Sequence, residues 1–396
     1  MLETDRWLLP EGIEELLPPE AARLERLHRR LLDLFDTWGY DLVIPPLVEY
    51  LESLLTGTGN DLDLQTFKLI DQVTGRLVGV RADMTPQAAR IDTHRLRREG
   101  PSRLCYLGTV LHTRPDGFAS SRSPLQVGAE LYGYAGVEAD VEIIRLMVET
   151  LRATGLEGLH LDLGHVGIFR GLARAAGLSA EQEAHLFEAL QRKARPEIGD
   201  FLAGLDIAEA LRYMLGELAG LNGGEEVLER ARQVLAHADA PVLDALDNLE
   251  RIATVLKQAL PEVQLHFDLG EVRGYNYHTG SIFSVFVPGY GQAVAQGGRY
   301  DEIGKVFGRA RAATGFSTDL RTLMALVPAI EPELRGIFAP WQEDPALETR
   351  IAELRAQGER VVRELPDQAG GVAEMGCDRT LIRQAGTWSV EPLKKA

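Results

Sequence analysis

The spacing of leucines near the N-terminus predicts an amphipathic helix. Leucines recur at intervals of three and four residues, which places them on one helix face: Leu24, Leu27, Leu31 and Leu34. Pro18 and Pro19 precede this helix, and Gly39 would end it. The next apolar run, residues 42–44, meets two prolines. Because proline donates no ladder hydrogen bond, we expect a strand that lies at a sheet edge or ends at Pro45. Such an edge often meets a partner.

Residues 66–85 show the pattern of a β-hairpin followed by a helix. Two apolar segments, residues 67–70 and 77–81, flank a turn at 71–75, and Pro86 would begin the helix. If residues 81–85 stay extended, alternate side chains lie on one face, because side chains alternate along a strand. That face would carry Arg81, Asp83 and Thr85.

Residues 125–131 alternate between apolar and polar or small side chains, which predicts a half-buried strand. The apolar side would carry Leu125, Val127, Ala129 and Leu131. The opposite side would carry Gln126, Gly128 and Glu130. The glycine between two polar groups would leave room for a ligand.

The middle of the chain predicts a helical insertion. Ser179 with Gln182 three residues later is a capping-box signature, and helix-forming stretches continue to Leu260 without a strand signal. Strand patterns bracket this segment at residues 159–163 and 263–287.

The end of the chain predicts a small αβ domain. It would contain a helix over about residues 345–365 and strands near Leu381 and residues 388–390. We therefore expect four segments: a first core part at 1–170, a helical insertion at 171–260, a second core part at 261–327 and the small domain at 328–396.

Composition narrows the class of protein. The 396 residues are 45% hydrophobic, enough for one large core and a smaller domain. Fifty-nine acidic against 42 basic residues give a net charge of -17, which repels polyanions and argues against nucleic-acid binding. The only cysteines, Cys105 and Cys377, form no disulfide framework or thiolate cluster. Residues 1–6 lack the order of a signal peptide, and no apolar stretch reaches ~18 residues. We expect a soluble, cytoplasmic protein.

Residues 273–280 contain the strongest candidate for ligand binding. Arg273 could grip both oxygens of a carboxylate, and Gly274 and Gly280 would let the backbone approach closely. The alternative is a turn whose arginine is solvated. Residues 297–301 give a weaker signal, because Gly-Gly before arginine is typical of a turn and lacks phosphate-loop spacing.

Hydrogen-bond acceptors elsewhere could complete a zwitterion site. They are Asp83, Thr85, Gln126 and Glu130. One cation with several acceptors matches a free amino acid, whereas the acceptors alone would fit a solvated sheet face. His112, His165 and His278 lack the spacing of metal ligands, so we predict no metal. No Walker or Gly-x-Ser-x-Gly sequence occurs, and we predict no cofactor.

Five ordered segments resemble those of histidyl-tRNA synthetases, which are class II synthetases. The resemblance extends over roughly residues 10–325. The five segments that carry it are residues 16–21, 81–85, 126–130, 273–280 and 297–301. The resemblance implies an α+β fold, in which an antiparallel sheet is flanked by helices. It also implies a homodimer formed through the first helix and the strand that ends at Pro45.

The same resemblance implies a histidine pocket. Asp83, Thr85 and Gln126 would hold the ammonium group. Glu130 and the region of Tyr277 would hold the imidazole, and Arg273 the carboxylate. Asp83 stands where the family usually has glutamate. His278 replaces the second tyrosine of a Tyr-Tyr pair and could make the site pH-sensitive.

Two departures affect the positions that grip ATP in synthetases. Where those enzymes carry Phe-Arg-x-Glu, this sequence places His112 at the arginine position. In the third of the sequence motifs that define class II synthetases, Thr322 occupies the position of the arginine. Asp319 adds a negative charge where the triphosphate is expected. Arg114, on the same strand face as His112, and Arg321 could supply a shifted replacement. One lost cationic donor costs about 10²- to 10³-fold in rate, so we predict little adenylate formation.

The tail lacks the basic-aromatic surface that an anticodon reader needs. The chain combines a synthetase-like body and a histidine pocket with altered nucleotide-binding positions and no anticodon domain. This combination resembles the family of regulatory subunits of ATP phosphoribosyltransferase. That resemblance implies a non-catalytic subunit in a hetero-oligomer with a short-form catalytic subunit. It would be required for the activity of that subunit in the first step of histidine biosynthesis and would bind histidine. The family is proposed to transmit feedback inhibition by histidine, and the sequence leaves open whether the bound molecule inhibits or activates. The alternatives are a divergent histidyl-tRNA synthetase and a free-standing histidine-adenylating enzyme.

Overall fold

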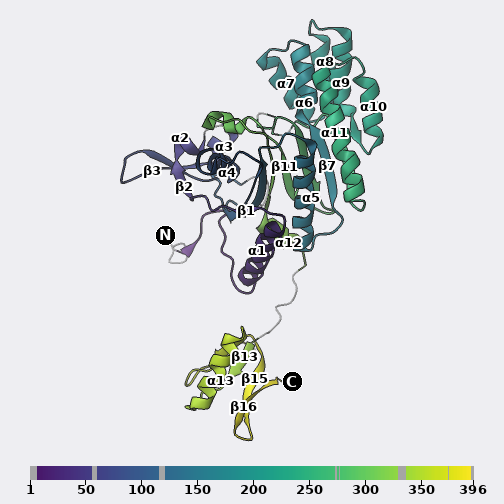
Figure 1. The fold of residues 1–396 in the computed structure, drawn as a ribbon. Coiled ribbons are helices and arrows are strands. Elements are labelled where there is room, and N and C mark those ends of the chain that lie inside the picture. The colour runs from purple at the N-terminus through teal and green to yellow at the C-terminus, as the bar shows by residue number, and fades with distance from the viewer. Residues whose placement is uncertain are drawn as a thin grey trace. The chain divides into compact units, whose positions relative to one another are not determined.

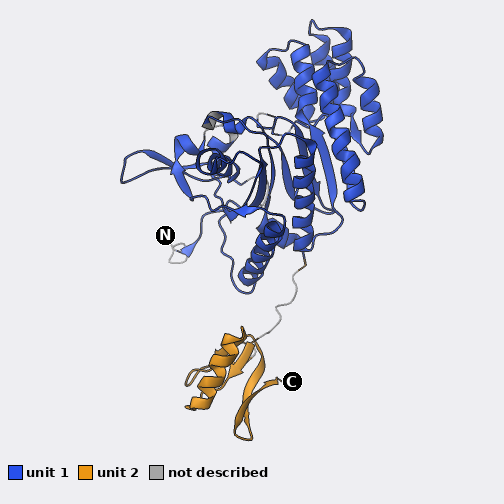
Figure 2. Cartoon of the chain, in the orientation of Figure 1, with its two compact units in different colours: residues 1–327 blue, residues 328–396 orange. Residues whose placement is uncertain are grey.

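The computed structural model describes most of the chain: residues 7–55, 60–115, 121–272, 274–275, 277–328, 336–372 and 374–393. The chain forms two units, residues 1–327 and residues 328–396 (Figure 2). Within the described ranges, none of the helices has the length and apolar character needed to cross a membrane.

The first helix and the strand after it agree with the sequence pattern. Helix α1 (Glu20–Thr37) is labelled in Figure 1. It buries Leu27, Leu31 and Phe35, and Gly39 follows its end with a positive φ of 76°. Strand β1 (Asp41–Leu42) ends before the prolines and pairs only with β5 (Ser102–Thr109), at the sheet edge. The edge-strand prediction is therefore confirmed.

A nine-stranded sheet forms the centre of the first unit, in the order β1-β5-β6-β12-β11-β10-β7-β9-β8. The remaining strands are β6 (Leu125–Tyr132), β7 (His160–His165), β8 (Asn222–Gly223), β9 (Gln264–Asp268), β10 (Ser281–Phe286), β11 (Ala295–Arg299) and β12 (Ala313–Asp319). Only the pairs β1/β5 and β7/β9 are parallel. The antiparallel core predicted from the resemblance is thus present.

The predicted alternation of β6 decides which face of the sheet is core. Val127, Ala129 and Leu131 join the hydrophobic core with α1, α5 (Val137–Thr154) and α12 (Leu320–Leu326). Glu130 points to the other face, where it lies opposite Gly315 of β12.

A small three-stranded sheet contains the predicted hairpin. Its order is β2 (Val48–Tyr50), β4 (Leu77–Val80), β3 (Phe67–Ile70), and the short helices α2 (Leu51–Leu54) and α3 (Asn60–Gln65) lie between β2 and β3 in the chain. Strands β3 and β4 pair antiparallel, as predicted.

Residues 81–85 do not stay extended, so the condition for a shared face of Arg81, Asp83 and Thr85 is not met. Met84 has helical backbone angles, and Thr85 already begins α4 (Thr85–Arg90), which a π-helix (Ile91–Leu96) continues. The Arg81 guanidinium donates to the carbonyls of Pro45 at 2.7 Å and Thr109 at 2.9 Å. Arg81 therefore fastens two backbone segments and does not share a strand face with Asp83.

Helices occupy most of residues 166–259 (Figure 1). They are α6 (Val166–Ala175), α7 (Ala180–Gln191), α8 (Arg195–Ala203), α9 (Glu209–Glu217), α10 (Glu226–Val234) and α11 (Ala240–Ala259). The capping box is confirmed: the Ser179 hydroxyl accepts from the Gln182 amide at 3.2 Å, and Gln182 Oε1 accepts from the Ser179 amide at 2.8 Å. The short strand β8, which pairs with β9, had no sequence signal.

The second unit is a four-stranded sheet with one helix, in the order β14-β13-β15-β16. Its elements are β13 (Gly336–Ala339), α13 (Pro345–Ala356), β14 (Arg360–Arg363), β15 (Cys377–Gln384) and β16 (Thr387–Pro392). The strands predicted near Leu381 and residues 388–390 are confirmed. The helix predicted to reach residue 365 is wrong: Gly358, with a φ of 85°, follows α13, and β14 takes the next residues.

The second unit has its own core, so we predict that residues 328–396 unfold cooperatively when isolated. Leu381 is 1% exposed within that core, and Leu365 is 62% exposed outside it. Leu381→Ala should lower the free energy of unfolding by about 2–5 kcal/mol. Leu365→Ala should change it by less than about 0.5 kcal/mol. Urea titration followed by tryptophan fluorescence measures both. Equal effects of the two substitutions would contradict the prediction.

Candidate functional site

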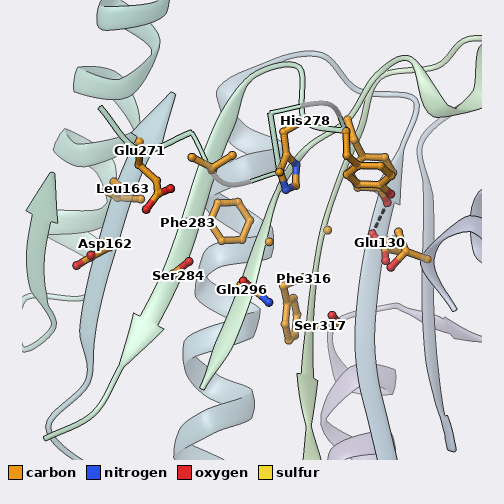
Figure 3. Close-up of a pocket in the computed structure, with 18 of the residues that line it drawn as sticks. Glu130, Asp162, Leu163, Glu271, His278, Phe283, Ser284, Gln296, Phe316 and Ser317 are labelled. Atoms are coloured by element: carbon orange, nitrogen blue, oxygen red, sulfur yellow. Dashed lines mark hydrogen bonds between the residues drawn. The ribbon is translucent and has the colours of Figure 1, made fainter. Parts of the chain in front are cut away.

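A cavity of about 440 Å³ lies beside strands β6, β12, β11, β10 and β7 (Figure 3). Residues 83–85 and the loop around residues 274–278 complete its lining. This volume is within the range of small-molecule sites. Among the residues that the structure describes, no group of three or more His, Cys, Asp or Glu side chains could hold a metal ion.

A buried carboxyl group defines one end of the cavity. Glu130 is 1% exposed, the Tyr106 hydroxyl donates to its Oε1 at 2.8 Å, and the Tyr300 hydroxyl donates to its Oε2. The Thr85 hydroxyl lies 2.9 Å from that of Tyr106. Burial raises the pKa of Glu130 to about 8, although both tyrosine hydroxyls act in the opposite direction. Burial therefore favours the protonated form of Glu130.

Two glycines make room for this arrangement. A Cβ on Gly128 would overlap the Tyr106 phenol, and a Cβ on Gly315 would overlap the Glu130 carboxyl. The prediction that Gly128 leaves room for a ligand is therefore wrong, because the ring of Tyr106 fills that space. Cross-strand pairing of Tyr106 with Gly128 causes this contact.

The predicted ammonium-binding residues lie at the same end. Asp83 and Thr85 line the cavity, and Asp83 Oδ1 accepts from the Thr85 amide at 3.0 Å. Gln126 donates to Asp83 Oδ1 at 2.7 Å and accepts from the Met84 amide at 2.9 Å. Gln126 is not among the lining residues, so its direct role is to orient Asp83.

The loop predicted to bind the rest of an amino acid is partly described. Arg273 lies outside the described residues. Tyr277 lines the cavity and stacks on Tyr300 with ring centroids 5.0 Å apart. The Tyr277 hydroxyl is buried, with no hydrogen-bond partner among the described residues. This hydroxyl is a candidate group for a ligand to satisfy.

His278 also lines the cavity, and burial lowers its pKa to about 4. Its ring is therefore neutral at physiological pH, which does not favour the suggestion that His278 makes the site pH-sensitive. Arg170 holds this loop by donating to the carbonyls of Tyr275 at 2.7 Å and His278 at 3.1 Å.

The opposite end of the cavity is acidic. Asp162, Asp268 and Glu271 line it, far from Glu130 in Figure 3 where Asp162 and Glu271 are labelled. Lys193 pairs with Asp268 at 2.5 Å but does not line the cavity. None of the described lining residues is lysine or arginine. Like charges repel, so this end opposes a triphosphate.

Of the positions predicted to grip ATP, His112 and Arg321 contact backbone carbonyls of this chain. His112 Nε2 lies 2.9 Å from the carbonyl of Ala82. Arg114 is exposed, and residues 113–115 do not continue a strand, so the predicted strand face shared by His112 and Arg114 is absent. Arg321 donates to the carbonyl of Glu14 at 3.3 Å.

Asp319 begins α12 as its N-terminal cap. Its carboxylate accepts from the amides of Arg321 at 3.1 Å and Thr322 at 3.3 Å, and from the Thr322 hydroxyl at 2.8 Å. It also accepts from the Leu125 amide at 2.9 Å. The carboxylate thus takes the helix-terminal donors that an anion could otherwise use.

The sequence analysis missed Tyr106, Asp162, Asp268 and Glu271. Tyr106 sits in an apolar run, residues 104–107, which gave no sign of a polar role. Asp162 interrupts the apolar pattern of β7, and this was the one available signal. Tyr300 lies in residues 297–301, one of the five segments that resemble histidyl-tRNA synthetases, but the sequence pattern predicts no role for it.

Comparison with known proteins covers both units of the chain. Residues 12–323 match the family model of histidyl-tRNA synthetase, and residues 334–391 match that of the ATP phosphoribosyltransferase subunit HisZ C-terminal domain. A regulatory subunit of ATP phosphoribosyltransferase from Thioalkalivibrio sulfidiphilus is 61% identical over 99% of this chain and 100% of its own length. One from Alkalilimnicola ehrlichii is also 61% identical, over 98% of each chain.

Solved structures agree with this assignment. A crystal structure from Bacillus halodurans, described as an ATP phosphoribosyltransferase regulatory subunit/histidyl-tRNA synthetase, superposes with a TM-score of 0.82 at 27% identity, covering 93% of this chain and 95% of that one. Histidyl-tRNA synthetase from Nostoc shares the fold, with a TM-score of 0.78 at 18% identity over 95% and 91%. The chain belongs to the family of ATP phosphoribosyltransferase regulatory subunits, non-catalytic subunits built on the fold of histidyl-tRNA synthetase.

Proposed function

We propose that this chain binds free histidine in the cavity beside Glu130 and passes that signal to a short-form catalytic subunit of ATP phosphoribosyltransferase. The complex would act in the first step of histidine biosynthesis, in the cytoplasm, with histidine as feedback inhibitor. The observation that carries the proposal is the contrast within one cavity. One end offers hydrogen-bond acceptors around the buried Glu130, and the other end carries carboxylates that oppose ATP.

The groups at the Glu130 end match the parts of a zwitterionic amino acid with a nitrogen-containing ring. Asp83 and Thr85 offer oxygen atoms to an ammonium group. Glu130 and the unpaired hydroxyl of Tyr277 suit a ring that both donates and accepts. Arg273 remains the proposed partner of the carboxylate.

We also propose that the subunit forms a homodimer within the hetero-oligomer. Apolar side chains next to the edge strand β1 are at least 42% exposed: Leu42, Ile44, Leu47 and Val48. Contiguous exposed apolar side chains are typical of a protein interface. A second copy would cover this surface and the adjoining part of α1.

Histidine binding should depend on Asp83 and Arg273. Asp83→Asn and Arg273→Ala each remove a charge that pairs with the ligand, so we expect the Kd for histidine to rise by about 10- to 100-fold. Asp162→Asn, at the opposite end of the same cavity, should change it by less than about threefold. Titration calorimetry measures all three. Unchanged heats in the first two variants would remove the site assignment.

ATP chemistry should be absent and hard to restore. We expect no histidine-dependent exchange between pyrophosphate and ATP, with a histidyl-tRNA synthetase measured alongside as a positive control. The double variant His112→Arg, Thr322→Arg should also be inactive, because Asp319 still caps α12 and the acidic end remains. Exchange by the unmodified chain at a rate like that of the control would favour the divergent synthetase instead.

The partnership itself should be visible as thermodynamic coupling. We expect the chain to co-purify with a short-form catalytic subunit. The presence of that subunit should change the affinity for histidine by a factor on the order of 5 to 150. Linkage requires histidine to change the affinity between the subunits by the same factor. Calorimetry in both directions measures the two factors. Two subunits that do not associate would contradict the proposed function.

A further inference from the structure

The Glu130 carboxyl is enclosed by groups that are neutral or acidic. Those that face it are Tyr106 from β5, Tyr132 from β6, Tyr277 from the loop before β10, Tyr300 after β11 and Asp83 before α4. Strand β12 contributes only Gly315. Within the described residues, no lysine or arginine forms a hydrogen bond with Glu130. Among the described residues, therefore, no cationic side chain is bonded to this carboxyl, and a ligand could bring the positive charge.

The hydrogen bonds limit what that ligand can be. Each oxygen of Glu130 already accepts one tyrosine hydroxyl, from Tyr106 on Oε1 and from Tyr300 on Oε2. These two bonds fix the plane of the carboxyl and leave it facing the cavity. The remaining lone pairs are then available to a ligand atom, with which a proton could be shared. Imidazole suits this role because its ring nitrogen donates or accepts within the physiological pH range.

Resting on the histidine binding proposed above, we propose that Tyr106 and Tyr300 are positioning residues that make Glu130 share one proton with the imidazole of the ligand. The bound pair is either a carboxylic acid with a neutral ring or a carboxylate with an imidazolium, and in both forms it holds one proton. Specificity for histidine follows, because aliphatic and amide side chains do not exchange a proton with a carboxyl group in this way.

Counting protons gives the pH dependence. Burial raises the pKa of Glu130 to about 8 in the empty site, and a free imidazole has a pKa of about 6.5. Below about pH 6.5 the separate partners hold two protons, so binding releases one. Above about pH 8 they hold none, so binding takes one up. Affinity should therefore be highest between these values and fall by up to about tenfold per pH unit on either side.

Histidine titrations from about pH 5.5 to 9.5, in buffers of different ionisation enthalpy, measure both the affinity and the number of protons exchanged. We expect proton release at the acidic end and uptake at the alkaline end. Glu130→Gln should abolish the part of the loss of histidine affinity above about pH 8 that comes from titration of the Glu130 carboxyl. The α-amino group of histidine also titrates there, so the difference between wild type and this variant isolates the carboxyl.

The tyrosine variants separate positioning from general damage. Tyr106→Phe and Tyr300→Phe each remove a donor that stabilises the carboxylate, so the alkaline fall should move to higher pH. Tyr132 is the matched control, because its hydroxyl lies 3.4 Å from that of Tyr300 and does not bond to Glu130. Tyr132→Phe should not change the alkaline pH at which the affinity for histidine begins to decrease. A uniform loss of affinity at every pH in the Tyr106 and Tyr300 variants would overturn the positioning role.

The outcomes also separate this inference from the proposed function. Histidine binding with the same alkaline profile in wild type and Glu130→Gln would overturn proton sharing but leave histidine binding intact. No heat at any pH, in protein whose circular dichroism shows it folded, would overturn both. If a phenylalanine variant fails to fold, the comparison of wild type with Glu130→Gln still decides whether the proton is shared.

Discussion

Burial of a single carboxyl group, that of Glu130, is the constraint on which the cavity depends. An acid removed from water costs several kcal/mol unless hydrogen bonds replace its hydration. Here two tyrosine hydroxyls replace it, and they reach it only because Gly128 and Gly315 have no side chains. The arrangement draws on β5, β6, β12 and the segment after β11. Its geometry is therefore a property of strand register across the sheet, and no single segment of the chain specifies it.

Electrostatics divides the cavity into two ends with different tolerance for charge. At one end, Glu130 and Thr85 are buried, and their oxygen atoms would stabilise a single cationic or proton-bearing group of a ligand. At the far end, Asp162, Asp268 and Glu271 line the cavity with carboxyl groups, and Lys193, which pairs with Asp268, does not line it. In the proposal above, a small zwitterion occupies the first end. A ligand as long and as negative as ATP would have to cross both.

Local patterns predicted the local structure, and non-local pairing decided the rest. The leucine spacing of α1, the Ser179 capping box and the alternation of β6 each depend on a few neighbouring residues, which explains their success. Tyr106 lay hidden in an apolar run because its role arises from pairing with Gly128 on another strand. The bend at Met84 was missed because periodicity carries no information about where a strand turns into a helix. Histidine as the ligand came only from the family resemblance, since spacing alone left a solvated sheet face open.

Asp319 satisfies the start of α12 without a bound anion. The first amides of a helix have no partner within the helix, and a bound phosphate is one way to satisfy them. In this chain the Asp319 carboxylate accepts from the amides of Arg321 and Thr322. A cap of this kind contributes about 0.5–2 kcal/mol, and it is present whether or not a ligand is bound. Thr322, at the position of the missing arginine, adds its hydroxyl to the same carboxylate. Restoring an arginine there would remove part of the cap and leave the competing carboxylate in place, so the two departures from the synthetase motif reinforce each other.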